Sequence, residues 1–267
     1  MTMDFAGVPF SHRATAILDV AAQRLRQVAH AAGGFQEWEA PFRLTYAESV
    51  AIPDARRDDE LNARLPGRLS LESRGVEQRL EGLRRVLSSP WPPDTAALVR
   101  DVHGALFVRT DPHAAGRFRA TDLALGPAHA ADVPELRLPA AGNIAAELSA
   151  LDGALSSLRQ AHPVARVACL YAGLVLVHPF RDGNGRSART IAEGALVHEG
   201  LLDRPVLSVE PVLRTYRRRT GYLLADIRRA GAVEPFVVFF AVCLMELCDA
   251  STRTFRARIG TVYHEFQ

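Results

Sequence analysis

Apolar residues recur at three- and four-residue steps along most of the chain, a spacing that gathers them on one face of an α-helix. In residues 12–32, for example, Ile17, Val20, Leu25 and Val28 follow this spacing. The same pattern predicts helices over the stretches 12–32, 69–88, 94–106, 144–159, 163–177, 185–200, 210–229 and 234–256. We therefore expect an all-α fold class, with helices packed on helices.

Two stretches depart from the amphipathic pattern. Residues 163–177 are apolar nearly all round, which indicates a central buried helix. Residues 112–143 contain glycines, prolines and short alternating pieces, which favour a short β-hairpin flap.

The prolines of the sequence SSPWPPD interrupt the helical pattern near residue 90. Because proline breaks helices, we place a joint there, between an N-terminal helical region of residues 1–92 and a core of residues 93–267. Asp94 is then suited to cap the first helix of the core.

Composition narrows the function classes. Hydrophobic residues make up 48% and charged residues 23% of the chain, as in ordinary soluble globular proteins. The net charge of +2 argues against a broad electropositive surface, so no nucleic acid partner is expected.

The apolar segments also bear on location. Cys169, Cys243 and Cys248 lie in apolar runs and are interpreted as core thiols, which suits a reducing, cytoplasmic compartment. The N-terminal sequence lacks the pattern of a signal peptide. Residues 236–247 are strongly apolar but too short for a membrane span, so no membrane association is expected.

Chemistry concentrates in the sequence VHPFRDGNGRSAR of residues 177–189. Asp182, Gly183, Asn184 and Gly185 form a turn-rich run whose backbone N–H groups can converge on an anion. The helix that follows directs its amino end, with a partial positive charge, to the same place. This combination predicts a binding site for phosphate groups.

Four side chains could complete such a site. Arg186 and Arg189 stand three apart on the first helical turn, and their guanidinium groups match phosphate oxygens. Asp182 offers a carboxylate of the kind that Mg²⁺ binds beside substrate phosphates. His178 can be neutral near pH 7 and can accept a proton from a hydroxyl nucleophile. Each residue alone has an ordinary structural explanation, and the hypothesis depends on their occurrence together within twelve residues.

The segment HPFRDGNGR resembles the signature of Fic-domain proteins, with every defined position filled, and Arg189 matches a second arginine of that family. Residues 115–125 are similar to the strand that begins the family's target-docking flap. Arg219 and Tyr222 resemble an Arg-x-x-Tyr pair on the helix that lines the adenine side. The resemblance is weaker over about 95–250 as a whole.

The resemblance implies a mainly helical Fic fold with residues 93–267 as the catalytic core. It implies a protein adenylyltransferase that moves AMP from ATP to a Ser, Thr or Tyr hydroxyl of a target protein, or of the enzyme itself. His178 would be the catalytic base, Asp182 would hold Mg²⁺, and the arginines would bind the phosphates. Gly183, Asn184 and Gly185 would hold the phosphates through the turn.

Many Fic proteins carry an inhibitory helix whose glutamate pairs with the second arginine. Two segments here are candidates for that helix: one begins at Ser49 but has Pro53 in place of the glutamate, and the other has Glu77 at the right spacing. In the first alignment Arg189 has no inhibitory partner, and the enzyme would be either unlocked or restrained by a separate inhibitory partner or by homo-oligomer formation.

Two alternatives to AMP transfer stay open. A related enzyme with this loop could use another donor, so that UMP, phosphocholine or phosphate is transferred. A non-catalytic nucleotide-binding adaptor could also retain the fold, although His178, Asp182 and Arg186 are all present.

Overall fold

The computed structural model describes residues 5, 10–51, 68–125 and 136–265. Within these residues the helices are α1 (His12–Ala31), α2 (Glu39–Ala51), α3 (Arg68–Ser88), α4 (Thr95–Phe107), α5 (Ile144–Ser157), α6 (Pro163–Val177), α7 (Asn184–His198), α8 (Glu210–Thr215), α9 (Arg217–Ala230) and α10 (Val233–Glu265). Single 3₁₀ turns occupy Ala32–Gly34 and Ala141–Asn143. The mainly helical fold class predicted from the periodicity is confirmed.

Helix boundaries follow local chemistry. The Asp94 carboxylate accepts a hydrogen bond from the backbone N–H of Ala97 at 3.0 Å, which confirms the predicted cap of α4. The helix expected over 210–229 is divided at Tyr216 into α8 and α9, and α9 ends at Gly231 with a φ of 66°. In addition, α2 was not predicted, and α10 continues beyond the expected end at residue 256.

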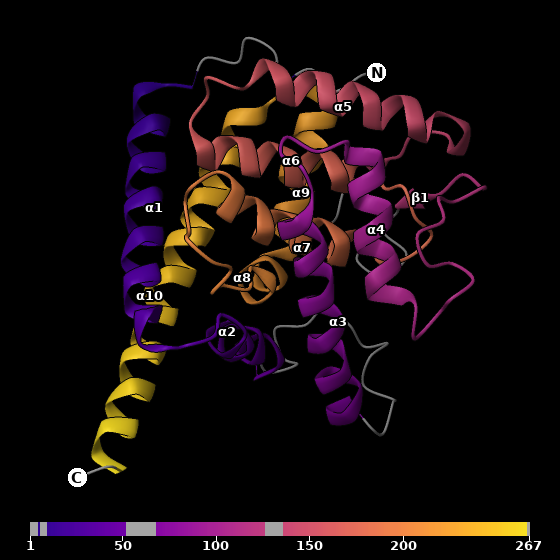
Figure 1. Ribbon diagram of the computed structural model, residues 1–267. Coiled ribbons are helices and arrows are strands. Elements are labelled where there is room, and N and C mark those ends of the chain that lie inside the picture. Colours follow the sequence, from indigo (N-terminus) through magenta and orange to yellow (C-terminus); the bar gives the residue numbers. More distant parts are fainter. Residues whose placement is uncertain (1–4, 6–9, 52–67, 126–135, 266–267) are drawn as a thin grey trace.

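Helix α6 lies at the centre of the bundle, in contact with α5, α7 and α10 (Figure 1). Its burial on nearly all sides confirms the expectation from its apolar sequence. A Cβ atom at Gly173 would lie 2.4 Å from a methyl of Leu151, so this glycine lets α5 approach α6 closely. The central helix is therefore a fixed support for the segment that follows Val177.

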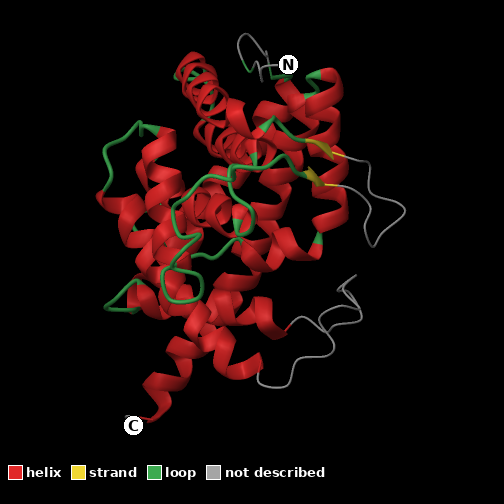
Figure 2. Ribbon diagram, turned by 90° about the vertical axis from the view of Figure 1, so that its right-hand side faces the viewer, coloured by secondary structure: helices red, strands yellow, loops and turns green. Residues whose placement is uncertain are grey.

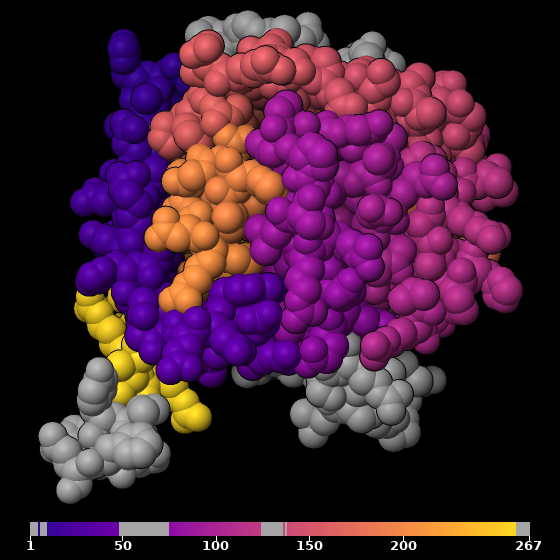
Figure 3. Space-filling view, viewed as in Figure 1, coloured from indigo at the N-terminus to yellow at the C-terminus, as the bar shows by residue number. Residues whose placement is uncertain are grey.

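The N-terminal helices pack on the remainder of the protein. Helix α1 runs beside α10 along one edge of the molecule (Figure 1), and Leu18 and Leu25 belong to the same apolar cluster as Leu176 and Phe240. In the space-filling view the segment after α7, in orange, lies between α1 and α3 (Figure 3). The division at residue 92 stays a sequence-based prediction.

Two short strands pair at the edge of the helical body (Figure 2). Strand β1 (Ala124–Leu125) and strand β2 (Leu136–Arg137) are antiparallel, with Ala124 opposite Arg137. Residues 126–135 between them lie outside the described residues, so the predicted hairpin flap stays a prediction.

The three cysteines are unpaired and buried, as predicted for core thiols. Burial raises the pKa of Cys169 to about 12, which leaves this thiol protonated and unreactive. Among the described residues, none of the helices has the length and apolar character needed to cross a membrane.

Candidate active site

The loop from His178 to Gly183 connects the buried helix α6 to the start of α7, and both of its ends have left-handed backbone conformations. His178 ends α6 with φ 51° and ψ 58°, a conformation that is uncommon for a residue with a side chain. Gly183 precedes α7 with a φ of 78°. The chain thus turns sharply twice and brings His178 close to the amino end of α7.

Position 183 requires a glycine because of the close packing around it as well as its positive φ. A Cβ atom there would lie 2.2 Å from the Phe107 ring, a distance that no repacking of a buried aromatic ring readily relieves. At Gly185 a Cβ atom would meet only the Arg189 side chain, at 3.0 Å. Of the two glycines in the predicted phosphate-binding turn, Gly183 therefore has the stricter structural requirement.

The His178 ring is oriented for proton acceptance. Its Nδ1 lies 3.2 Å from the carbonyl oxygen of Val175. Because a carbonyl only accepts, Nδ1 carries the proton and Nε2 holds the free lone pair. Burial lowers the pKa of His178 to about 4, so the imidazole is neutral near pH 7. Within the described residues Nε2 has no hydrogen-bond partner.

Arg119 holds the backbone of this histidine. Its Nε donates to the carbonyl oxygen of His178 at 2.9 Å, and its backbone N–H donates to the carbonyl of Pro179 at 2.9 Å. The same guanidinium donates to the carbonyl oxygens of Thr121 at 3.0 Å and Pro139 at 2.5 Å, next to the two strands. One buried arginine therefore connects the base of the strand pair to the strained end of α6.

His103 holds the other end of the loop. Its Nδ1 accepts the backbone N–H of Gly116 at 3.0 Å, so the proton lies on Nε2, which donates to the carbonyl of Asp182 at 3.1 Å. The ring also stacks on Phe180, with centroids 3.7 Å apart, and on Phe107 at 4.4 Å. Burial lowers the pKa of His103, which favours the neutral form that these two hydrogen bonds need.

Asn184 stabilises the loop from within. Its Oδ1 accepts the backbone N–H of Phe180 and its Nδ2 donates to the carbonyl of Phe180, each at 2.8 Å. The side chain is thus engaged with the loop backbone, which leaves the backbone N–H of Asn184 for the phosphate role that the family resemblance implies.

Asp182 and Arg186 lie on the solvent side of the loop. The Asp182 side chain is 79% exposed, and its Oδ2 accepts from Arg186 Nη2 at 3.0 Å. Arg186 also lies over the Phe107 ring, 4.2 Å from its centroid. These exposed charges are available to an incoming anion because the ion pair between them is weak in water.

Arg189 faces inward, into a buried cluster of charges. Its Nε donates to Glu210 Oε2 at 2.5 Å. Arg79 lies beside this pair, donates to Glu193 at 2.5 Å and to the carbonyl of Arg186 at 2.9 Å, and is itself almost fully buried. Although burial alone would raise the pKa of Glu210, Arg189 and Arg79 lower it, so Glu210 is ionised.

The remaining predicted residues lie elsewhere. Arg219 and Tyr222 are exposed on α9, and no hydrogen bond or ion pair among the described residues joins them to the loop. Glu77 forms a two-point ion pair with Arg43 of α2, at 2.5 and 3.1 Å, and is 53% exposed. The acid that contacts Arg189 is Glu210. Ser49 lies in α2, and Pro53 lies outside the described residues.

A magnesium ion would depend on Asp182. Within the described residues no group of three or more His, Cys, Asp and Glu side chains could hold a metal ion. Mg²⁺, however, commonly binds through one or two carboxylates together with substrate phosphates. The exposed Asp182 carboxylate beside the start of α7 fits that kind of site.

Sequence reasoning did not identify His103, Arg79, Glu193 or Glu210. The available signal was weak: Glu193 and Glu210 are isolated charges within otherwise apolar stretches, which is where buried ion pairs occur. No local signal marks His103, because its role depends on the turn that brings Gly116 and Asp182 to the same ring.

Comparison with known proteins gives one family model and several curated relatives that resemble this chain. Residues 93–196 match the family model described as Fic/DOC family. The chain is 26% identical over 196 residues to a protein adenylyltransferase Fic of Nematostella vectensis, covering 72% of this chain and 42% of the relative. It is 28% identical over 151 residues to a protein adenylyltransferase Fic of Culex quinquefasciatus, covering 56% and 27% respectively. The chain thus spans less than half the length of these curated relatives.

Solved structures agree on the fold. A Fic family protein from Desulfovibrio desulfuricans G20 superposes with a TM-score of 0.65 at 18% identity, over 89% of this chain and 74% of that one. Fic-1 from C. elegans gives a TM-score of 0.59 at 20% identity, over 93% and 74%. The HPFRDGNGR loop between α6 and α7 thus lies inside the segment, residues 93–196, that matches the Fic/DOC family model.

Proposed function

We propose that this protein is an adenylyltransferase that transfers AMP from ATP to a hydroxyl group of a protein side chain. The observation that carries the proposal is the state of His178: a neutral imidazole with a free Nε2, next to the amino end of α7. The names of the curated relatives from Nematostella vectensis and Culex quinquefasciatus support the same reaction.

In the proposed reaction the hydroxyl oxygen of the target attacks the α-phosphorus of ATP. The bond from that phosphorus to the bridging oxygen of the β-phosphate breaks, and pyrophosphate leaves. The hydroxyl proton passes to Nε2 of His178, which its Nδ1–H bond to Val175 and the Arg119 contact hold in orientation. Positioning and charge stabilisation supply most of the rate in this class of reaction.

The phosphates would lie at the start of α7. The backbone N–H groups after Gly183 face them, together with the partial positive charge of the helix. Arg186 can turn from Asp182 to a phosphate oxygen at small cost, because that ion pair is exposed. Oδ2 of Asp182 would then be free to hold Mg²⁺, which would neutralise charge on the phosphates, while Oδ1 accepts the backbone N–H of Gly183.

Arg189 has a different part in the proposal. Its Nε contact with Glu210 fixes the guanidinium behind the first turn of α7, so Arg189 adds positive charge from below the phosphates. Arg219 and Tyr222 on α9 stay proposed contacts of the adenine, as the family resemblance implies.

The test uses ATP labelled at either the α- or the γ-phosphate, with Mg²⁺ and a host lysate, and identifies the modified protein by mass spectrometry. AMP transfer gives label only from the α-position and an adduct with the mass of AMP, whereas phosphate transfer gives label only from the γ-position. A His178→Ala variant is the control. No adduct from ATP, but one from UTP or CDP-choline, would overturn the donor assignment.

A further inference from the structure

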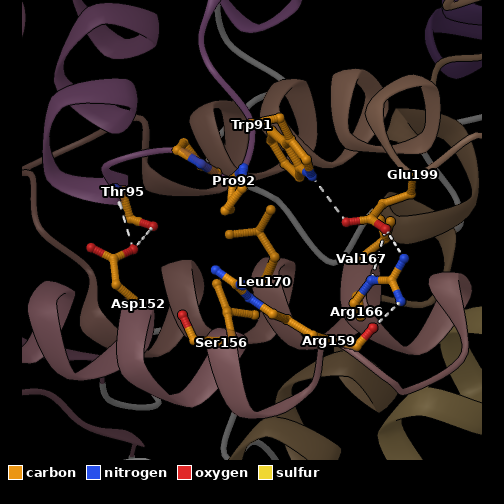
Figure 4. A pocket seen from close by; sticks show the side chains of 12 residues that line it. Trp91, Pro92, Thr95, Asp152, Ser156, Arg159, Arg166, Val167, Leu170 and Glu199 are labelled. Carbon is orange, nitrogen blue, oxygen red and sulfur yellow. Dashed lines mark hydrogen bonds and ion pairs between the residues drawn. The ribbon is translucent and has the colours of Figure 1, made fainter.

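A cavity lies at the end of the bundle opposite the catalytic loop. It has a volume of about 370 Å³ and is enclosed by the linker before α4, by α5, by the first half of α6 and by the end of α7 (Figure 4). This volume is within the range of small-molecule sites. The α6 residues that line the cavity, Arg166 to Leu170, precede His178 by 8 to 12 residues, which is about 12–18 Å along the helix axis.

One surface of the cavity is apolar and rigid. Pro92, Leu155 and Leu170 line it, and Leu170 and the neighbouring Val167 are buried in the core. The Trp91 ring stacks on His198, with centroids 4.6 Å apart and an interplanar angle of 1°. An apolar or aromatic group placed here would contact surfaces that are already ordered, so little conformational entropy would be lost.

Most of the polar groups around the cavity already have partners. Arg166 is ion-paired with Glu199 and donates to the carbonyls of Arg159 and Ala161. Trp91 Nε1 donates to Glu199 Oε1 at 3.0 Å.

The acidic side of the cavity is likewise engaged. Asp152 Oδ1 accepts from both the backbone N–H and the hydroxyl of Thr95. These contacts are drawn in Figure 4. The carboxylates of Asp152 and Glu199 are therefore fixed parts of the wall, and neither needs a cationic ligand.

Arg159 is the exception. Its side chain is exposed and extends across the cavity (Figure 4), and within the described residues its guanidinium has no hydrogen bond or ion pair. Its backbone carbonyl is held by Arg166 Nη1 at 3.1 Å, so the position of the residue is fixed while the charge is free. The charge that a ligand can use is thus positive.

We propose that this cavity binds a small monocarboxylate with an apolar or aromatic body. The carboxylate would pair with the Arg159 guanidinium, which presents two parallel donors to its oxygens. The apolar body would lie against Pro92, Leu155 and Leu170. A polyanion such as a nucleotide is disfavoured, because the nearby Asp152 and Glu199 carboxylates would repel its additional charges.

The test compares 4-phenylbutyrate with the uncharged 4-phenylbutyramide, which has the same apolar body. Binding to the full chain is measured by isothermal titration calorimetry. We expect the carboxylate to bind about tenfold more tightly than the amide, a difference of about 1.4 kcal/mol, and Arg159→Gln to remove that difference because the charge-assisted bond is lost. Ser156→Trp, an exposed substitution at the cavity wall, should abolish binding of both compounds.

Arg117→Gln, which removes an exposed arginine from another surface, is the matched control and should leave both affinities unchanged. Equal affinities for acid and amide, full affinity in Arg159→Gln, or no binding at millimolar concentration would each overturn the proposal. The outcome is independent of AMP transfer, because no residue of the catalytic loop takes part.

Discussion

The exposed face of the catalytic loop and the charge cluster behind it use similar residues in opposite ways. On the exposed face, Asp182 and Arg186 form an ion pair in water, and the His178 Nε2 has no partner among the described residues. Behind the loop, Arg79 and Glu193 are buried and paired. The difference teaches that charges paired in water can rearrange around a ligand, whereas buried pairs are fixed by the cost of separating them.

The largest expected effect tests the exposed face. His178→Ala should lower the rate of AMP transfer by roughly 10²–10⁴-fold, because it removes the proposed general base. The free energy of unfolding should change little, since Nδ1 makes a single hydrogen bond. The measurement is α-labelled ATP incorporation beside urea denaturation. A variant that retained most of the wild-type rate would rule out His178 as the base.

The buried cluster should respond in the opposite sense. Arg79→Met leaves Glu193 without its cation and should lower the free energy of unfolding by about 3–5 kcal/mol. Urea denaturation measures this loss. Arg84→Met, which removes an exposed ion pair with Glu39, is the matched control and should cost about 0–1 kcal/mol. Similar losses in both variants would mean that the cluster is not a distinct source of stability.

Arg119→Lys tests the backbone contacts that hold the catalytic loop in place. Lysine keeps the charge but cannot donate in the same geometry to His178, Thr121 and Pro139. We expect kcat to fall about tenfold, equivalent to about 1.4 kcal/mol, with little change in KM for ATP. Arg117→Lys, two residues away and exposed, is the control. An equal loss of affinity for ATP would indicate general disruption instead of misplacement of the base.

The pH dependence provides a smaller but specific test. In the proposed reaction His178 is the neutral base, and burial lowers its pKa to about 4. The rate should therefore fall only as the pH drops through about 4, and the kcat/KM profile should be flat through 6.5, where an ordinary histidine titrates. Circular dichroism at each pH checks that the protein stays folded. An acidic limb near 6.5 would show that solvent reaches the ring in the free enzyme.

The smallest effect is expected at Glu77. This carboxylate is ion-paired with Arg43 and exposed, and Arg189 is paired with Glu210. Glu77→Gly should therefore leave self-modification by labelled ATP unchanged. Glu77→Gln serves as a companion variant that avoids the cost of glycine within a helix. A marked increase in both variants would restore Glu77 as an inhibitory residue.

The sequence predicted the elements of the fold well where periodicity is strong. The apolar pattern identified α1, α3 and α6 within about a residue of their ends, because burial of one face, or of all faces, dictates which positions are apolar. It missed α2, where apolar residues such as Phe42 and Leu44 are spread around the helix and do not gather on one face. The break at Tyr216 was also missed, since no proline or glycine marks it.

For the site, the sequence identified the loop but not its supports. His178 and Gly183 belong to one short segment, so their proximity follows from the chain itself. Arg119 lies 59 positions before His178, and His103 lies 79 positions before Asp182. Such contacts between distant segments depend on how helices pack, and the pattern of one sequence does not encode them locally. The inward direction of Arg189 was missed for the same reason, because its partner Glu210 comes 21 residues later.

The bonds of Arg119 have a consequence for how the protein can diversify. Each hydrogen bond of its guanidinium ends on a main-chain carbonyl: those of His178, Thr121 and Pro139. Main-chain groups are the same whatever side chains they carry, so mutation along the strand pair can alter the surface there while the histidine keeps its support. The surface of the strand pair can therefore change in evolution without loss of the contacts that hold the end of α6.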